Sequence, residues 1–413
     1  MSLTNLAEES ATSSRSAFAI TVKNVRNRLV KAIYMPVLVS MVMLGTFVVV
    51  TRLAFEPLRV PTSSDMLGAV VLVGGALAIS ELLPGRQCGP STSCGYVPTY
   101  HTCGFLYFCA MLGMHVGATV ASIIDATFWA DTFVGVEVLL QLGALALCWY
   151  LHAFPDETPA PHAAGIRGFF WGRSLHPRIL RYDVKQMVNS RIGMMYWALL
   201  VTSYMSRDSS CIPLVCCALA QLLYIAKFFA WERGYFFTLD IMHDRAGYYL
   251  LWGCLVWLPH LYALPVRTLS TYGSSLTDMQ SVGLLVVAVV ATACNYVVDL
   301  ERRTFRDEGA KTKRAHIAIK HRVNGEDVTS RLLLEGWWGR ARHINYTFEL
   351  ALAWAWGGFG GTVHVALYLY PTFLTVLLLH RLKRDEDRCR LKYGQDYEGY
   401  CRAVPYRLIP YIF

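Results

Sequence analysis

The sequence predicts an all-α polytopic membrane protein with about ten transmembrane helices. Of its 413 residues, 54% are hydrophobic and 16% are charged, whereas soluble domains average about 25% charged residues. Apolar runs long enough to cross a bilayer, which takes about 20 residues each, recur from residue 33 to residue 379. Inside lipid a helix satisfies its own backbone hydrogen bonds, so these runs are expected to be α-helices.

The expected spans follow one another closely along the chain. They cover residues 33–51, 66–83, 105–124, 133–151, 192–204, 211–229, 247–264 and 282–298, with a final pair within 348–379. We treat 32–413 as a single transmembrane domain that follows a polar tail, 1–31. Neither a separate soluble domain nor a removable signal peptide is expected.

Basic residues indicate the orientation of these spans. Five of them precede the first span, namely Arg15, Lys23, Arg26, Arg28 and Lys31, which favours a cytosolic N-terminus. The connections 154–191 and 299–342 and the tail 380–413 then fall on the cytosolic side and hold most of the Lys and Arg. The connections 205–210 and 267–280, on the opposite side, hold one Arg each.

The largest insert between spans, 299–342, contains a predicted β-hairpin. Its sequence HIAIKHRVNGEDVTSRLLLEG has two partly alternating runs around Asn324-Gly325. Asn-Gly favours the type I′ turn that joins two antiparallel strands. We therefore expect a small cytosolic hairpin.

The chain lacks the common local motifs for metals and for phosphates. Cys88, Cys94 and Cys103 cluster in a predicted cytosolic connection, where disulfides are rare, and no Cys/His set has the spacing of a zinc site. We expect free thiols and no metal. Neither a G-x-G-x-x-G strand-to-helix motif nor a Walker motif is present. Side chains would therefore have to bind the phosphates of any nucleotide.

Three polar clusters on the cytosolic side are candidates for such a site. In LERRTFRDEG, Arg302 and Arg306 share a helix face four residues apart and could clamp a phosphate. On spacing alone, a basic cluster flanking a span is the favoured alternative. The second cluster, 332–350, groups aromatic and polar residues that could stack on a base and bind an amide, with an interfacial aromatic belt as the alternative: Trp337, Trp338, Arg342, His343, Asn345 and Tyr346.

The third cluster is the tail, RDEDRCRLKYGQDYEGYCRAVPYRLIPYIF. Asp385 could accept hydrogen bonds from a ribose, and Arg390 and Lys392 could donate to phosphate. Tyr393 and Tyr400 supply rings. An amphipathic helix at the membrane interface is the alternative explanation for this composition.

The motifs GWWGRARHINY and RDEDRCRLKYG, together with VPYRLIPYIF, resemble the two signature regions of the membrane sterol reductase family. FFWGRSLHPRI (169–179) and LDIMHDRAGYYLLWGCLVWLPHLYALP (239–265) resemble two further motifs of that family. The four motifs occur in the family's order and cover most of the chain from residue 169, whereas the first 160 residues match weakly. The family comprises Δ14-, Δ7- and Δ24(28)-sterol reductases and the membrane part of the lamin B receptor.

The resemblance implies NADPH as cofactor, a sterol as substrate and membrane lipid as surroundings, with no nucleic acid and no named protein partner. The implied cofactor contacts are Arg302, Arg306, Leu333, Trp338, Asn345, Tyr346, Asp385, Cys389, Arg390, Leu391, Lys392, Tyr393 and Tyr400. Arg302 replaces a common Lys. Phe348-Glu349 replaces a common Gly-Asp, which leaves substrate choice open.

The implied reaction is reduction of a sterol ring double bond by a hydride from NADPH and a proton from an acid. Tyr262 is the implied acid, and His243 and Asp244 are the runners-up. Cys254 and His260 stand where Δ14 members typically have an acidic residue and a Phe. We therefore expect the Δ7 bond of a 5,7-diene, in the endoplasmic reticulum membrane if the cell is eukaryotic. A Δ14 or Δ24 reductase, an isoprenylcysteine methyltransferase-like enzyme and a non-catalytic sterol-binding protein are the alternatives.

Overall fold

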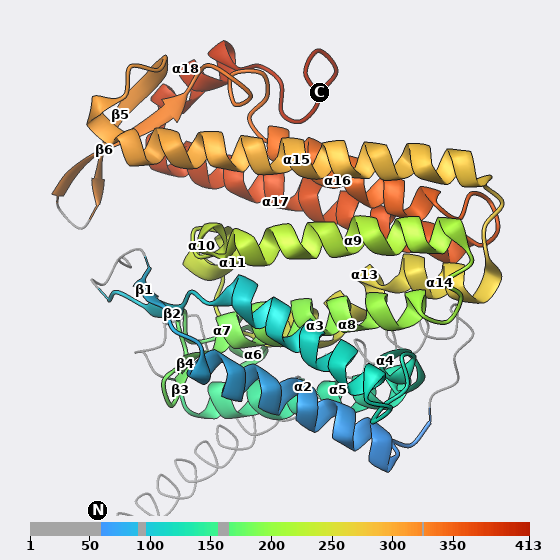
Figure 1. The fold of residues 1–413 in the computed structure, drawn as a ribbon. Coiled ribbons are helices and arrows are strands. Elements are labelled where there is room, and N and C mark those ends of the chain that lie inside the picture. Colours follow the sequence, from blue (N-terminus) through green and yellow to red (C-terminus); the bar gives the residue numbers. More distant parts are fainter. Residues whose placement is uncertain (1–58, 90–95, 156–164, 324–325) are drawn as a thin grey trace, which may run out of the picture.

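The computed structural model describes residues 59–89, 96–155, 165–323 and 326–413, and it is mostly helical (Figure 1). The expected span 33–51 lies outside the described residues. Within the described residues, six helical segments are long and apolar enough to cross a membrane. They are α2 (Ser63–Leu82), α5 (Phe133–Ala153), α9 (Ile212–Ala230), the run Tyr248–Tyr272, and the segments Asp278–Lys311 and Val365–Tyr393.

Three shorter helices occupy the other expected spans. They are α3 (Gly104–Val120), α8 (Met194–Met205) and α16 (Ile344–Gly358). The α8 helix continues a helical segment made of α7 (Val184–Gln186) and the π-helix η1 (Met187–Gly193). The structure therefore supports an integral membrane protein, and the total of ten spans stays a prediction.

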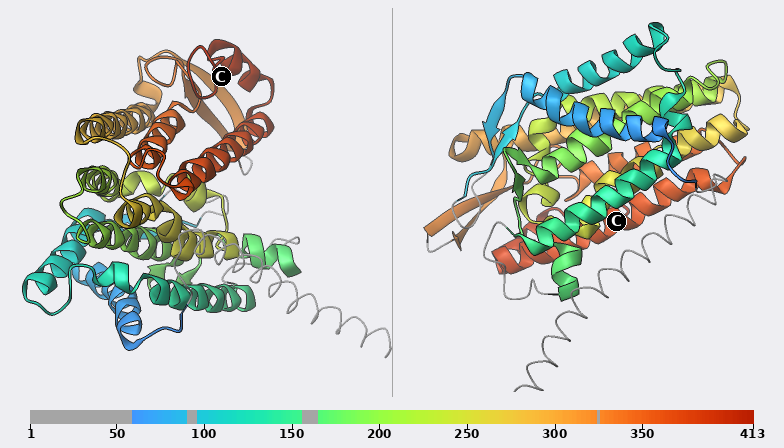
Figure 2. Two further views of the ribbon diagram at one scale, coloured as in Figure 1. Left: turned by 90° about the vertical axis from the view of Figure 1, so that its right-hand side faces the viewer. Right: turned by 90° about the horizontal axis from the view of Figure 1, so that it is seen from below.

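The helices lie side by side in layers (Figures 1 and 2). The layer formed by α15 (Asp278–Glu308), α16 and α17 (Leu369–Tyr393) packs against α9, and α8 separates α9 from α2 and α5. At one end of the bundle lie α6 (Gly165–Trp171), α10 (Glu232–Tyr235), α11 (Leu239–Met242) and α18 (Gln395–Ala403). We call this the tail end. The short helix α4 (Phe128–Asp131) lies at the opposite end (Figure 1).

The helix α15 is long enough to extend beyond the bilayer at the tail end. Its 31 residues correspond to about 46 Å, against about 30 Å for the hydrocarbon core. A capping box fixes its start, because Thr277 accepts a hydrogen bond from the backbone N–H of Gln280 and the Gln280 side chain accepts one from Thr277 N–H. Its last turns can therefore present charged side chains outside the lipid.

The run Tyr248–Tyr272 corrects one sequence-based prediction. The last expected span before the 267–280 connection ends at residue 264, which places Arg267 in a loop. The structure shows that helix α14 (Leu264–Tyr272) follows α12 (Tyr248–Trp252), the π-helix η2 (Gly253–Trp257) and α13 (Leu258–Tyr262) almost without a break. Pro259 and Pro265 stand in the first turns of α13 and α14, where proline is compatible with a helix. Arg267 is therefore only 2% exposed, with its guanidinium 4.7 Å from the ring centroid of Phe133.

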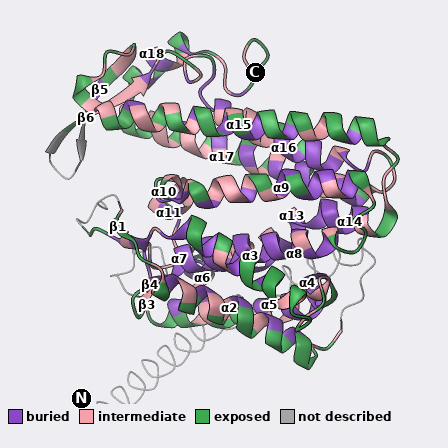
Figure 3. Cartoon of the chain, viewed as in Figure 1, coloured by how far each residue is buried: buried purple, intermediate pink, exposed green. Residues whose placement is uncertain are grey.

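Burial follows the layers (Figure 3). The helix α8 is almost entirely buried, and its Trp197 and Tyr204 are among the largest fully buried side chains. The outer faces of α2 and α15 expose apolar residues such as Val70 and Val286. Such faces are suited to lipid rather than water.

The tail end carries three two-stranded antiparallel sheets. The strands β5 (His316–Val323) and β6 (Glu326–Leu333) pair on either side of Asn324-Gly325, with Val323 opposite Glu326, as the Asn-Gly pattern predicts. The pairs β1 (Arg86–Cys88) with β2 (Thr99–His101) and β3 (Arg178–Ile179) with β4 (Tyr182–Asp183) were not predicted, because strands of two or three residues leave no periodic signal.

Candidate active site

The last turns of α15 carry Arg302, Arg303 and Arg306, and Arg303 points away from the other two. Arg302 lies over the Trp338 ring, 4.6 Å from its centroid, whereas Arg303 lies 5.0 Å from the ring of Trp231 at the end of α9. Arg302 and Arg306 share a helix face, as the sequence predicts, and both are exposed. Two guanidiniums are therefore open to an anion on one face of α15.

The loop after β6 brings an aromatic ring to this face. Trp338 donates from Nε1 to the carbonyl of Val298 at 2.9 Å, and it is buried together with Leu333. Glu301 accepts the N–H of Trp337 at 3.0 Å. At Gly336, whose φ is +65°, an added Cβ would lie 1.8 Å from a Glu301 oxygen, so the turn requires glycine.

The first turn of α16 adds His343, Asn345 and Tyr346. The rings of His343 and Tyr346 stack with centroids 5.4 Å apart, and the Asn345 carbonyl accepts a hydrogen bond from Asn295 at 3.3 Å. Burial lowers the pKa of His343 to about 4, and the neighbouring carboxylate of Asp385 opposes that shift. His343 is therefore neutral at pH 7 and offers one donor and one acceptor.

The helix α17 contributes further charges at the same place. Asp385 pairs with Arg388 at 2.7 Å. Arg302, Asp385 and Arg388 lie close enough to Arg306 for their charges to influence its pKa. The charges of Asp385 and Arg302 likewise influence the pKa of Tyr346. Candidate residues from α15, α16 and α17 thus converge on one region, which we call the arginine cluster: Arg302, Arg306 and Arg388, with Asp385. Arg388 was not predicted.

Cys389 and Tyr400 adjoin the arginine cluster, since the charge of Arg302 acts on both. Burial raises the pKa of Tyr400 to about 12, so its hydroxyl stays protonated. Cys389 and Tyr393 pack on the small apolar core formed by Tyr397, Tyr400 and Val404.

Two of the predicted tail contacts, Arg390 and Leu391, point elsewhere. Arg390 pairs with Glu398 at 3.2 Å and with Glu386 at 3.5 Å. Leu391 is 90% exposed, and the Lys392 ammonium lies 5.0 Å from the Tyr393 ring centroid. In this structure the side chains of Arg390 and Leu391 are not directed at the arginine cluster, and their cofactor role stays a prediction.

The final segment of the chain is fastened by Arg342. Its Nη1 donates to the carbonyls of Val404 and Pro405 at 2.7 and 3.0 Å, and its Nε and Nη2 donate to Glu386. Both side chains of this pair are almost fully buried. Arg342 therefore holds the tail in place rather than facing a ligand, although the sequence grouped it with the candidate ligand-binding residues.

His243 and Asp244 form the turn after α11, at the tail end. Asp244 pairs with Arg384 of α17, and Lys185 donates to the carbonyls of Asp240, Ile241 and Asp244 at 2.6–2.9 Å. Partial burial lowers the pKa of His243, and the charge of Arg388 acts in the same direction. This turn is thus held rigidly beside α17, and its carboxylate already has a cationic partner.

Tyr262 lies deeper, at the end of α13, among aromatic rings. The ring centroid of Trp197 is 5.1 Å from that of Tyr262, and the ring centroid of Tyr370 is 4.5 Å from it. Trp356 stacks on Tyr370 and meets Tyr224 edge-on. The charge of Glu349, on α16, acts on Tyr262. The structure therefore separates Tyr262 from the His243–Asp244 turn and surrounds it with rings.

Glu349 has hydrogen-bond partners that sequence reasoning missed. Tyr224 donates to its two oxygens at 3.2 and 3.0 Å, and Asn295 donates to Oε1 at 3.1 Å. Lys227 in turn contacts Asn295 and Asp299. The available signal was the presence of polar residues within apolar helices, which marks functional candidates. Phe348, which replaces the common Gly, packs edge-on against Trp337 with centroids 5.4 Å apart.

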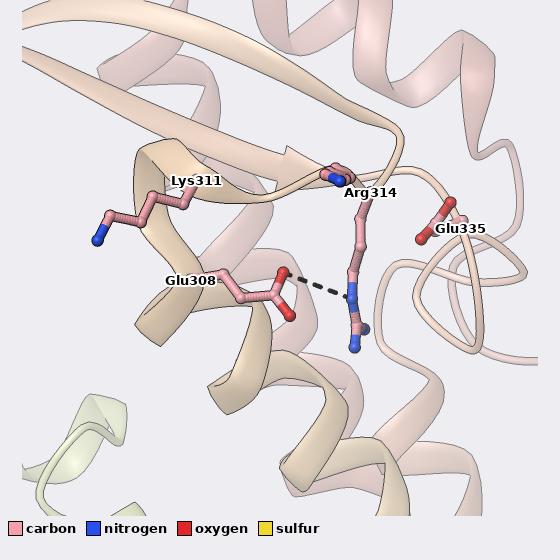
Figure 4. A pocket seen from close by; sticks show the side chains of 5 residues that line it. Glu308, Lys311, Arg314 and Glu335 are labelled. Carbon is pink, nitrogen blue, oxygen red and sulfur yellow. Dashed lines mark ion pairs between the residues drawn. The ribbon is translucent and has the colours of Figure 1, made fainter.

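A separate charged hollow lies beyond the end of α15 (Figure 4). It encloses about 430 Å³ and is lined by Glu308, Lys311, Lys313, Arg314 and Glu335. Arg314 pairs with Glu308 at 3.7 Å. Two carboxylates there offset the cations, so the hollow suits phosphates less well than the arginine cluster does.

Comparisons with known proteins identify the family of this chain. The model of the Ergosterol biosynthesis ERG4/ERG24 family matches residues 18–413. The chain therefore belongs to this family.

Curated relatives fall into two groups by name. The chain is 35% identical over 354 residues to the 7-dehydrocholesterol reductase of Arabidopsis thaliana, covering 80% of this chain and 81% of the relative. It is 31% identical over 332 residues to the Delta(14)-sterol reductase erg24 of Schizosaccharomyces pombe, covering 76% of each. It is 33% identical over 310 residues to the Delta(14)-sterol reductase TM7SF2 of Mus musculus, covering 73% of this chain and 72% of the relative.

Proposed function

We propose that this chain is an NADPH-dependent sterol reductase that reduces the Δ7 double bond of a 5,7-diene sterol, in the endoplasmic reticulum membrane if the cell is eukaryotic. One observation carries the proposal. The helix α16 begins with Asn345 and Tyr346 beside the arginine cluster and, about 6 Å further along its axis, presents Glu349 on the side of Tyr262. A basic region and a partly buried carboxyl group thus lie next to each other.

The residues of the arginine cluster suit the phosphates of NADPH. Arg388 pairs with Asp385, the charges of both influence Arg306, and Arg302 and Arg306 are exposed. Guanidiniums bind phosphates through charge-assisted hydrogen bonds, and a second one on the same face can reach a 2′-phosphate. Trp338, Tyr346 and Tyr400 would supply rings and donors for the rest of the nucleotide.

NADPH, when bound, supplies a hydride. A carbon–carbon double bond without a carbonyl is a poor hydride acceptor, so the protein must supply a proton that makes one carbon electrophilic. Tyr262 is the proposed acid because its phenol lies inside the bundle among Trp197 and Tyr370. Those rings exclude water, which would otherwise trap a carbocation.

The choice of the Δ7 bond rests on the relatives and on one neighbouring side chain. The 7-dehydrocholesterol reductase of Arabidopsis thaliana is matched over a larger share of both chains than the two Δ14-sterol reductases, although that of Xenopus laevis is matched over a smaller share. Cys254, which stands where Δ14 members typically have an acidic residue, is among the groups that act electrostatically on Tyr262. Δ14 reduction is the second candidate, because two relatives carry that name.

A direct assay tests the proposal. Membranes that contain the purified protein are incubated with NADPH and, separately, with sterols unsaturated at Δ7, Δ14 or Δ24, and the products are separated. Loss of the Δ7 bond alone is expected. Reduction of the Δ14 sterol without reduction of 7-dehydrocholesterol would move the chain to the second candidate, and reduction of none would overturn both.

A further inference from the structure

Three helices place polar side chains at helical spacing along one partly buried seam. The helix α9 contributes Tyr224 and Lys227, three residues apart. The helix α15 contributes Asn295 and Asp299, four residues apart. The helix α16 contributes Glu349. Because residues three or four apart share a helix face, each helix directs these side chains towards the other two.

The seam is connected by hydrogen bonds from its deep end to its outer end. Tyr224 and Asn295 donate to Glu349 at 3.0–3.2 Å. Lys227 donates to the Asn295 amide oxygen and to Asp299 Oδ2, the latter at 3.3 Å. Asp299 and Lys227 are partly exposed, with side chains 29% and 14% accessible. The outer end of the seam therefore reaches water, and Glu349 lies at the inner end.

The inner end adjoins the aromatic group around Tyr262. Tyr224 and Tyr262 both pack on the Trp197 ring, with centroids 6.0 and 5.1 Å from it. Charges on Glu349 and Tyr262 act on Tyr224, and that on Glu349 acts on Tyr262. Tyr370 is the phenol nearest to Tyr262, but of Tyr370 and Tyr224 it is Tyr224 that donates to Glu349, whose charge also acts on Tyr262.

We propose that Glu349 is a proton-supplying residue that acts through Tyr224 to reprotonate Tyr262 after each turnover. The inference rests on the proposed reductase function and adds a residue to it. Glu349 does not touch the reacting carbon in this scheme, so its role differs from that of Tyr262.

Each proton transfer in this scheme breaks one bond to hydrogen and forms another. The O–H bond of Tyr262 breaks as its proton forms a C–H bond with the alkene. The phenolate oxygen takes the Tyr224 hydroxyl proton, and the Tyr224 oxygen takes the carboxylic proton of Glu349. The remaining carboxylate accepts a hydrogen bond from Asn295 near the Lys227 ammonium, and water at the outer end supplies the next proton.

Packing alone is the competing explanation for the seam. A polar contact between apolar helices can simply join them. That explanation requires hydrogen bonds at Glu349 but no transferable proton. Glutamine keeps the size and hydrogen-bonding capacity of glutamate and lacks the proton, so Glu349→Gln separates the two explanations.

The test uses the full-length protein in membranes, with NADPH and the sterol that the unmodified protein reduces. Glu349→Gln should lower kcat about tenfold to a hundredfold, with the NADPH dissociation constant and the sterol KM unchanged. The solvent deuterium isotope effect on kcat should rise, because proton delivery becomes slow. Glu349→Asp should restore much of kcat, and Asp307→Asn, at a carboxylate 72% exposed on α15, serves as the matched control.

The outcomes distinguish this inference from the proposed function. A protein that reduces no sterol with NADPH would overturn the proposed function itself. An active protein whose Glu349→Gln variant keeps its kcat and isotope effect would overturn only the role of Glu349. If Glu349→Gln does not fold, as judged by thermal unfolding and NADPH binding, Tyr224→Phe decides. It leaves Glu349 in place, and unchanged turnover in that variant would also refute the pathway.

Discussion

Arg342 and Glu386 form a buried ion pair that joins the loop before α16 to α17, with two donor atoms of the guanidinium 3.0 and 2.8 Å from one carboxylate oxygen. The same guanidinium holds the carbonyls of Val404 and Pro405. Together with backbone hydrogen bonds from Arg342 and His343 to the carbonyls of Tyr406 and Arg407, this side chain fixes the final segment of the chain. The pair therefore couples the stability of the tail to the nucleotide region.

Breaking this pair should destabilise the tail. Arg342→Ala removes the buried hydrogen bonds to Glu386 and leaves that carboxylate with the longer ion pairs to Arg390 and Arg407, at 3.5 and 3.4 Å, so we expect a loss of about 1–3 kcal/mol. Thermal unfolding in detergent and limited proteolysis of the tail would measure it. The double variant Arg342→Met with Glu386→Met should recover part of the loss. A single variant as stable as the unmodified protein would show that the pair does not hold the tail.

Arg306 should determine preference for NADPH over NADH. Arg306→Ala removes a charge-assisted hydrogen bond that contributes about 1.5–3 kcal/mol, so the NADPH dissociation constant should rise about 10- to 150-fold. NADH binding should change little. Arg303→Ala is the matched control, because Arg303 lies over Trp231 instead. Equal use of both nucleotides by the unmodified protein would contradict the assignment.

Tyr262→Phe should lower turnover by about 10²–10⁴-fold, the usual contribution of a general acid. The ring contacts with Trp197 and Tyr370 are kept in this variant, so folding and NADPH binding should be unchanged. Turnover under saturating NADPH and equilibrium binding of NADPH provide the two measurements. Full activity in Tyr262→Phe would direct attention to His243 and Asp244.

His176 should make stability depend on pH. It is 4% exposed and lies 3.3 Å from the Tyr100 hydroxyl, and burial lowers its pKa to about 4, assisted by the charge of Lys185. In the unfolded chain its pKa is about 6.5. The unfolded state therefore binds more protons between pH 6.5 and 4, and stability should fall by up to about 3 kcal/mol as pH is lowered through that window. His176→Gln should flatten the slope, whereas an unchanged slope would assign it to other groups.

The sequence was informative where the signal is local. Hydropathy located most of the described helices, Asn324-Gly325 located the hairpin, and the four-residue spacing placed Arg302 and Arg306 on one face. Arg267 was misplaced because a proline and an arginine after an apolar run are typical of a loop. In the structure, Pro265 begins α14, and Arg267 packs over Phe133.

Non-local contacts could not be predicted in the same way. Tyr224 and Glu349 are 125 residues apart, and Arg342 and Glu386 are 44 apart. No spacing rule connects such residues, because helix packing in three dimensions brings them together. The sequence consequently identified Arg342 as a candidate ligand-binding residue, whereas its guanidinium is occupied by Glu386 and by two carbonyls of the tail.

The central claim is that hydride from NADPH and a proton delivered by Tyr262 add across one sterol ring double bond. The most direct measurement is mass spectrometry of the product after incubation of the membrane-embedded protein with a 5,7-diene sterol and NADPH deuterated at the transferable position. We expect loss of the Δ7 bond with one deuterium retained on carbon, and a second deuterium when the reaction runs in heavy water. An unchanged diene, or a reduced sterol without deuterium from the nucleotide, would contradict the account.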